Sequence, residues 1–226
     1  MKMKKVRTLL IKSDTGISLS EIPLFRGAII NSMERSDSLY HNHHDDSVIY
    51  RYPLIQYKRI NRHASILGVE QGADILGGFV QKDISRLKLG ERETAFSITD
   101  IIARQCLIQV WDKQFEYQIR KWLPFNAENY RAYLSTEGLA ERIHLLEDIL
   151  KGNLLSFAKG IGETISSTIV CTITMLESPV LYTYKGVKMM GVDAVFKTNI
   201  SLPDYIGLGK GVSLGFGSIK QKRNEQ

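Results

Sequence analysis

The chain has 226 residues, of which 43% are hydrophobic and 24% charged, and its formal net charge is +6. This length suits one large domain or two small ones, and the composition excludes a disordered chain. No apolar run approaches the ~20 residues of a membrane helix, and no signal-peptide cleavage site follows the basic N-terminus. Cys106 and Cys171 are too few for a disulfide framework or a four-cysteine zinc site. We interpret them as buried free thiols of a cytoplasmic protein without a membrane partner.

The first predicted elements are a strand and a helix. A strand is expected over residues 5–11, which are rich in aliphatic and β-branched side chains. A helix should follow from Ser18 to about Met33, because its apolar residues recur at helical spacing. Ser18 and Glu21 fit a capping box, with Ser18 as the cap and Glu21 reaching back to it.

The remainder of the first half adds three strands and one helix. Pro53 should place an edge, a bulge or a break in the strand that contains it. With the first strand and helix, the result is the β-α-β-β-α-β order of a ferredoxin-like sheet. The predicted strands cover residues 47–58, 64–69 and 93–98, and the helix covers 71–81.

The second half resembles a degenerate copy of the first. Its long helix has strongly periodic apolar residues, which predict a core-facing stripe. The sequence therefore predicts an α+β protein with tandem ferredoxin-like (RRM-like) domains, at residues 1–110 and 111–226, and a C-terminal glycine-rich loop. The expected elements are strands at 108–118, 167–175, 180–184 and 186–197, and helices at 127–135 and 139–157.

A segment rich in histidine follows the first helix. His41, His43 and His44 are three of the five histidines in the chain. Histidine titrates near neutral pH and serves as a general acid or base, and His41 and His43 would project to the same side of an extended segment. Two alternatives remain open at this point. The histidines, with Asp45 and Asp46, could bind zinc, manganese or iron, or they could form a plain surface loop.

The second unusual segment is the glycine-rich stretch GLGKGVSLGFG, which covers residues 207–217. Consecutive backbone N–H groups in such a loop can form a concave anion site. A dinucleotide-binding fingerprint is excluded because no helix can follow, and a P-loop lacks its Gly-Lys-Ser/Thr. The alternative is a tight glycine-rich hairpin that binds no ligand.

Three stretches together, LYHNH, VIYRYPLIQYK and GLGKGVSLGFG, resemble the CRISPR-associated repeat-processing endoribonucleases of the RAMP superfamily, in the branch that serves type I-B systems. The glycine pattern G-Φ-G-x5-G-Φ-G, where Φ is hydrophobic, is complete at Gly207, Gly209, Gly215 and Gly217. Residues 70–200 agree with this family only in the order of their elements.

The resemblance implies cleavage of CRISPR precursor RNA within its repeats, without a metal or other cofactor. The 2′-hydroxyl attacks phosphorus and leaves a 2′,3′-cyclic phosphate and a 5′-hydroxyl. His43 is the first catalytic candidate, His41 the second and Tyr50 the third. His44 could replace His43. Lys58 or Lys210 would stabilise the charge of the transition state.

The resemblance and the basic residues also indicate how RNA is held. The candidate RNA-binding residues are Lys58, Arg59, Arg51, Arg26, Gly207, Gly209, Lys210, Gly211, Gly215 and Gly217. The expected partner is CRISPR precursor RNA, and a CRISPR effector complex and a homodimer remain open. One alternative function is a non-catalytic RNA-binding subunit of such a complex, which would need no histidines. Another is a toxin-type or repair-type ribonuclease without a CRISPR link.

Overall fold

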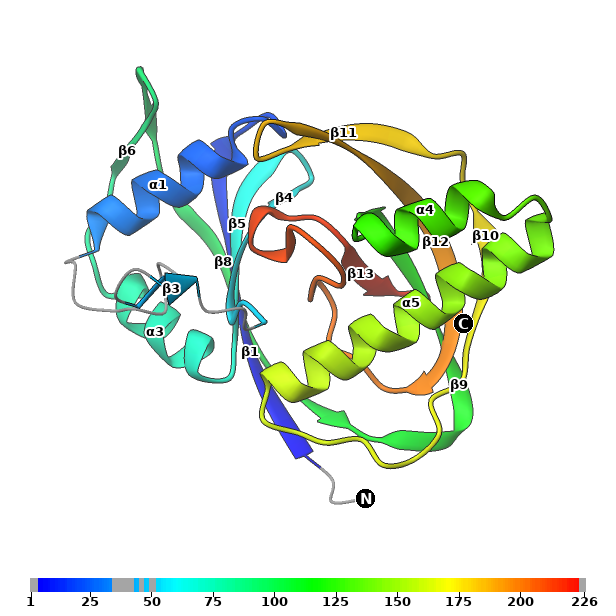
Figure 1. The fold of residues 1–226 in the computed structure, drawn as a ribbon. Helices are drawn as coiled ribbons and strands as arrows, with labels where there is room; N and C mark the ends of the chain where they lie inside the picture. Colours follow the sequence, from blue (N-terminus) through cyan, green and yellow to red (C-terminus); the bar gives the residue numbers. More distant parts are fainter. Residues whose placement is uncertain (1–3, 34–42, 45–46, 49–51, 224–226) are drawn as a thin grey trace. The chain divides into compact units, whose positions relative to one another are not determined.

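The computed structural model describes residues 4–33, 43–44, 47–48 and 52–223 (Figure 1). The chain divides into two compact units. The N-terminal unit comprises Lys5–Cys106 together with Ser213–Gly215, and the C-terminal unit comprises Leu107–Val212 with Lys4 and the residues from Phe216 onward. Each unit combines helices with a sheet, so the predicted α+β class is confirmed. None of the helices in the described ranges is both long and apolar enough to cross a membrane.

The N-terminal unit contains a four-stranded sheet in the order β4-β5-β1-β8. Numbered along the chain, these strands run 2-3-1-4, which is the arrangement of a ferredoxin-like β-α-β-β-α-β unit. β5 pairs antiparallel with both β1 and β4, and this register places Lys58 opposite Ser65. The strands are β1 (Lys4–Gly16), β4 (Ile55–Ile60), β5 (His63–Val69) and β8 (Ile98–Ile108).

Helices α1 (Ile22–Ser32) and α3 (Gln71–Val80) cover one face of this sheet (Figure 1). Alternate residues of the strands, such as Ile66 on β5, point into this core, as period-2 alternation requires. Tyr57 on β4 also belongs to it and packs edge-on against Phe25 of α1, with ring centroids 5.9 Å apart. Tyr57 is therefore a packing residue.

Two predicted elements of this unit need correction. Residues 93–95 of the strand predicted at 93–98 do form a strand, β7 (Arg92–Ala95), but it pairs with β6 (Arg86–Leu89) and does not join the four-stranded sheet. The fourth strand of the sheet is β8, an edge strand with mostly exposed side chains and therefore little apolar alternation to predict it. The strand predicted at 47–58 is divided into β3 (Ser47–Val48) and β4, so a break does occur near Pro53.

The capping box before α1 is half confirmed. The Glu21 carboxylate accepts a hydrogen bond from the Ser18 backbone N–H at 2.8 Å, as predicted. The Ser18 hydroxyl instead lies 3.0 Å from the Ser20 hydroxyl, and no side chain caps the helix. The helix begins later than predicted, at Ile22, so Ser18 lies too far upstream to serve as its cap.

The C-terminal unit is built on the same plan. Its sheet has the order β10-β12-β9-β13, which again runs 2-3-1-4 along the chain, and β11 pairs beside β12. The elements are β9 (Val110–Trp122), α4 (Ala127–Ser135), α5 (Leu139–Gly160), β10 (Cys171–Leu176), β11 (Val180–Tyr184), β12 (Val187–Ile200), the 3₁₀ turn η1 (Val212–Leu214) and β13 (Ser218–Gln221). The apolar stripe of α5 is confirmed as core, since Leu146, Leu150, Leu154 and Phe157 are fully buried.

The C-terminal unit has no α-helix between its third and fourth strands, which is the sense in which the copy is degenerate. In the N-terminal unit, α3 connects the third and fourth strands of the sheet. In the C-terminal unit, residues 201–217 make that connection and contain only the short turn η1. Sequence analysis placed no strand after the glycines, yet β13 follows at Ser218 and pairs with β9. The glycine-rich segment therefore occupies the place of a helix.

Candidate active site and nucleic-acid interface

The histidine segment forms a small antiparallel pair of strands in the N-terminal unit. β2 (His43–His44) pairs with β3 (Ser47–Val48), with His43 opposite Val48 and His44 opposite Ser47. His43 therefore has the extended backbone that the sequence predicts for it. The predicted partners His41 and Tyr50 lie outside the described residues, as do Asp45 and Asp46.

The tip of the glycine-rich loop belongs to the same unit as His43. Gly215 lies against β4, because a Cβ atom there would be 3.1 Å from the Tyr57 carbonyl oxygen. It also lies close to Ile22, the first residue of α1, whose Cδ1 atom would be 3.4 Å from that Cβ. The tip thus contacts the two elements that flank the histidine segment in sequence.

The rest of the loop is tightly closed by its own backbone. The Leu208 N–H donates to the Gly217 carbonyl at 2.9 Å, and the Gly217 N–H donates to the Lys121 carbonyl at 3.0 Å. Gly217 has φ +62°, and a Cβ atom there would lie 1.8 Å from the Leu208 carbonyl oxygen. Only glycine fits at such a position, so packing accounts for this part of the glycine pattern.

These bonds decide which loop amides are available to a phosphate. The N–H groups of Lys210 and Phe216 also donate within the unit, to the carbonyls of Leu123 and Gly211. The N–H groups of Gly209 and Gly211 make no hydrogen bond within the part of the chain that the structure describes. The Lys210 side chain is exposed. Gly211 is buried, so an anion would meet the Gly209 amide and one ammonium group.

Lys58, a predicted RNA-binding residue, is almost completely buried, with 1% of its surface exposed. It lies on the sheet face opposite the helices, across from Ser65, which is also buried. Neither the Lys58 Nζ nor the Ser65 Oγ has a hydrogen-bond partner among the described residues. Burial lowers the pKa of Lys58 to about 7, because the ammonium form loses its hydration. Ser65 was not predicted, since no local pattern reports which residue lies opposite on a neighbouring strand.

The arginines that are predicted to bind RNA differ in how far their guanidinium groups are available to a phosphate. The Nε of Arg59 donates to the Ile17 carbonyl at 2.6 Å, so part of this guanidinium serves the fold. Arg26 is half-buried on α1, and Arg51 lies outside the described residues. Among the described residues no cluster of His, Cys, Asp and Glu could hold a metal ion. The metal alternative for the histidine segment is not tested, because His41 and both aspartates are outside that set.

Two family profiles together span nearly the whole chain. The profile of the Cas6b N-terminal domain matches residues 1–106, and that of the Cas6b C-terminal domain matches residues 109–222. The chain belongs to the Cas6b family. This membership agrees with the resemblance that the histidine and glycine segments indicated, and it extends over the middle of the chain, where no motif was recognised.

Known proteins similar to this Cas6b chain agree with that assignment. A crystal structure of Cas6b is 26% identical, covers 97% of this chain and 100% of its own, and superposes with a TM-score of 0.85. A CRISPR RNA processing endoribonuclease Cas6b has the same coverage, 24% identity and a TM-score of 0.73, which indicates a shared fold. An uncharacterized protein of Methanocaldococcus jannaschii is 38% identical over 103 residues, which are 45% of this chain and 67% of that protein.

Proposed function

We propose that this Cas6b protein is an endoribonuclease that cleaves CRISPR precursor RNA within its repeats. The ribose 2′-hydroxyl attacks the adjacent phosphorus, and the products carry a 2′,3′-cyclic phosphate and a 5′-hydroxyl. The observation that carries this proposal is the match of both Cas6b domains, end to end, to a chain with histidines in the expected segment. A similar fold in a protein described as a CRISPR RNA processing endoribonuclease supports it.

The chemistry assigns a role to each candidate side chain. The reaction needs a base for the 2′-hydroxyl and an acid for the leaving 5′-oxygen, and His43 and His41 supply these groups. Tyr50 orients the 2′-hydroxyl or donates to a phosphate oxygen. These three residues need no metal ion, so cleavage should not depend on one.

The positive charge for the transition state comes better from Lys210 than from Lys58. Lys210 is exposed and follows Gly209, whose N–H is available to an anion. Lys58 is buried, and a pKa of about 7 leaves it only partly charged at neutral pH. Arg26, Arg51 and Arg59 bind phosphates along the strand.

The proposal also covers what the enzyme associates with. RNA of a CRISPR repeat presents ends and unpaired bases. Proteins recognise RNA by these features because the major groove of an RNA helix is too narrow for side chains. We place the enzyme in the cytoplasm with its precursor transcript, and we propose a CRISPR effector complex and a second copy of the chain as partners. Size-exclusion chromatography with light scattering tests the homodimer directly.

The direct test is cleavage of the host's own repeat RNA, with the product ends mapped. Cleavage should proceed in EDTA, and it should stop when the 2′-hydroxyl beside the cut is replaced by hydrogen, while binding survives. Loss of cleavage in EDTA would favour the metal alternative instead. Binding of repeat RNA without any cleavage would favour a non-catalytic subunit.

A further inference from the structure

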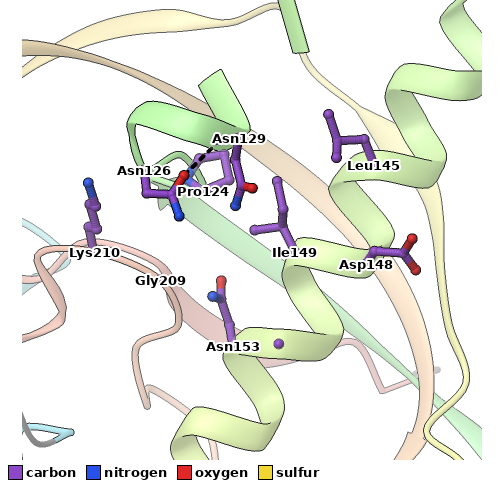
Figure 2. A pocket seen from close by; sticks show the side chains of 10 residues that line it. Pro124, Asn126, Asn129, Leu145, Asp148, Ile149, Asn153, Gly209 and Lys210 are labelled. Atoms are coloured by element: carbon purple, nitrogen blue, oxygen red, sulfur yellow. Dashed lines mark hydrogen bonds between the residues drawn. The ribbon is translucent and has the colours of Figure 1, made fainter. Parts of the chain in front are cut away.

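The C-terminal unit has an open cavity of about 490 Å³ beside the glycine-rich loop (Figure 2). Helices α4 and α5 supply most of its lining, and Pro124, Asn126, Gly209 and Lys210 supply the remainder. The volume lies in the range of small-molecule sites. Gly209 and Lys210 are predicted phosphate contacts, but the other residues that line this cavity have no role in the site described above.

Three asparagine amides face this space (Figure 2). The Asn126 Oδ1 accepts from the Asn129 backbone N–H at 2.7 Å, and the Asn153 Oδ1 accepts from the Trp122 Nε1 at 2.9 Å. These bonds fix the two amides with their oxygens occupied, so their NH₂ groups remain as donors. The Asn129 side chain makes no hydrogen bond within the described part of the chain and keeps both its donor and its acceptor.

The cavity therefore has more donors than acceptors. Its donors are three amide NH₂ groups, the Gly209 N–H and the Lys210 ammonium. Its acceptors are the Asn129 oxygen and Asp148, and the Asp148 carboxylate is already paired with Lys151 at 2.9 Å. A ligand that satisfies this set must present several acceptor atoms and few donors.

The walls of the cavity favour a flat, partly apolar ligand over a bare phosphate. Pro124 and Ile149 line it with buried apolar surface, which a phosphate cannot use. Gly152 lies in the middle of the 22-residue helix α5, where glycine costs about 1 kcal/mol relative to alanine. No atom within 4 Å would contact a Cβ at Gly152, so packing does not require this glycine. Its effect is to keep that side of the cavity open.

We propose that this cavity binds one unpaired uracil base of the RNA substrate. The Asn129 amide pairs with the imino N–H and one carbonyl of the base, and the amides of Asn126 and Asn153 donate to its remaining acceptors. The base packs against Pro124 and Ile149. Adenine and guanine fit less well because their amino groups add donors where the cavity already has donors. This inference rests on the proposed function only in taking RNA as the ligand.

The test compares binding of 2′-O-methyl uridine and adenosine hexamers, which cannot undergo 2′-hydroxyl attack, by fluorescence anisotropy with the full-length protein. The native protein should prefer the uridine hexamer. Gly152→Leu should fill the cavity, lower uridine affinity roughly tenfold and abolish the preference. Gly78→Leu is the matched control, because Gly78 is also an exposed helical glycine with open space around its Cβ position. Both changes should favour helix formation, but only the first should affect binding.

A second pair of variants tests the amide itself. Asn129→Asp keeps the shape of the side chain but replaces its donor by an acceptor, and it should abolish the uridine preference. Asn61→Asp makes the same change at an exposed position of the N-terminal unit and should not. Unchanged uridine preference in both Gly152→Leu and Asn129→Asp would overturn the proposal. Equal displacement of both hexamers by inorganic phosphate would also overturn it, in favour of a phosphate site.

Cleavage assays separate this inference from the proposed function. Gly152→Leu should raise the KM for repeat RNA and leave kcat within about twofold, because the cavity binds without touching the reacting atoms. Normal cleavage by Gly152→Leu with an inactive His43→Ala would remove the cavity proposal and keep the nuclease. Normal cleavage by His43→Ala, together with weaker uridine binding by Gly152→Leu, would keep the cavity proposal and remove the proposed catalytic role of His43.

Discussion

The two units of this Cas6b protein share one strand order but differ in what connects the third strand to the fourth. In the N-terminal unit this connection is helix α3, whose Leu76 and Phe79 pack into the core. In the C-terminal unit it is the glycine-rich segment before β13, which contains one short 3₁₀ turn. The shared strand order therefore does not require an α-helix between the third and fourth strands.

The difference between the two connections indicates where this fold can present functional groups. A packed helix satisfies its own backbone, whereas the loop that replaces it leaves the N–H groups of Gly209 and Gly211 without a hydrogen bond within the described chain. The N-terminal unit has both helices of the ferredoxin-like plan and contains the strand pair β2–β3, which includes His43. We infer a division of labour, with acid–base groups in the first unit and much of the RNA-binding surface in the second.

The largest expected effect tests the catalytic side of this division. His43→Ala should slow cleavage of repeat RNA by ~10²–10⁴-fold, because it removes a proton-transfer group, and it should leave RNA affinity nearly unchanged. Single-turnover cleavage and anisotropy measure the two quantities. His63→Ala is the control, since His63 is an exposed histidine of the same unit. Equal rates for His43→Ala and the native enzyme would exclude His43 from catalysis.

Gly217→Ala tests whether the loop is as constrained as a packed element. The new methyl group would lie 1.8 Å from the Leu208 carbonyl oxygen, so the loop must rearrange. We expect a loss of about 3 kcal/mol or more in the free energy of unfolding, measured by urea denaturation. Gly186 has a similar φ of +78° with open space around it, so Gly186→Ala should lose only about 1 kcal/mol. Equal losses would show that the close contact is unimportant.

Lys58→Met tests what the buried lysine costs the N-terminal unit. The folded pKa of Lys58 is about 7 and lies below its ordinary value of 10.5, so the unfolded chain binds the extra proton between these values. Native stability should therefore rise with pH across that window. The variant should be more stable by about 1–4 kcal/mol near pH 7, and this gain should shrink toward pH 10. Urea denaturation at several pH values measures the gain in the free energy of unfolding. A gain that does not vary with pH would contradict the assigned cost of burying the lysine.

The smallest expected effect concerns the individual phosphate contacts. If Arg26, Arg51, Arg59 and Lys210 each neutralise one phosphate, the plot of log affinity against log salt should have a slope of roughly −3 for single-stranded RNA. Lys210→Ala should reduce that slope by about 0.7. Lys58→Ala should leave it unchanged, because Lys58 is buried. A flat salt dependence in the native protein would argue against charge-driven RNA binding.

Local patterns were sufficient for most of the regular elements. Helical spacing predicted α5 over 139–157, and its stripe is buried as expected, because a helix that covers a sheet must turn one apolar face inward. Pro53 predicted an edge, a bulge or a break in its strand, and a break occurs before β4. The prediction failed at β8 and β13, since an edge strand with exposed side chains and a four-residue strand carry almost no periodic signal.

By itself, the sequence determined the α+β class, the repeated plan of the two halves, and the histidine and glycine segments that led to the family. The tertiary structure alone decided that Lys58 is buried opposite Ser65, that the Gly215 tip lies against β4, and that Asn126, Asn129 and Asn153 face one cavity. Periodicity and motifs report what a residue prefers within its own segment. Strand register and helix packing bring together residues far apart in the chain, and no local pattern encodes that proximity.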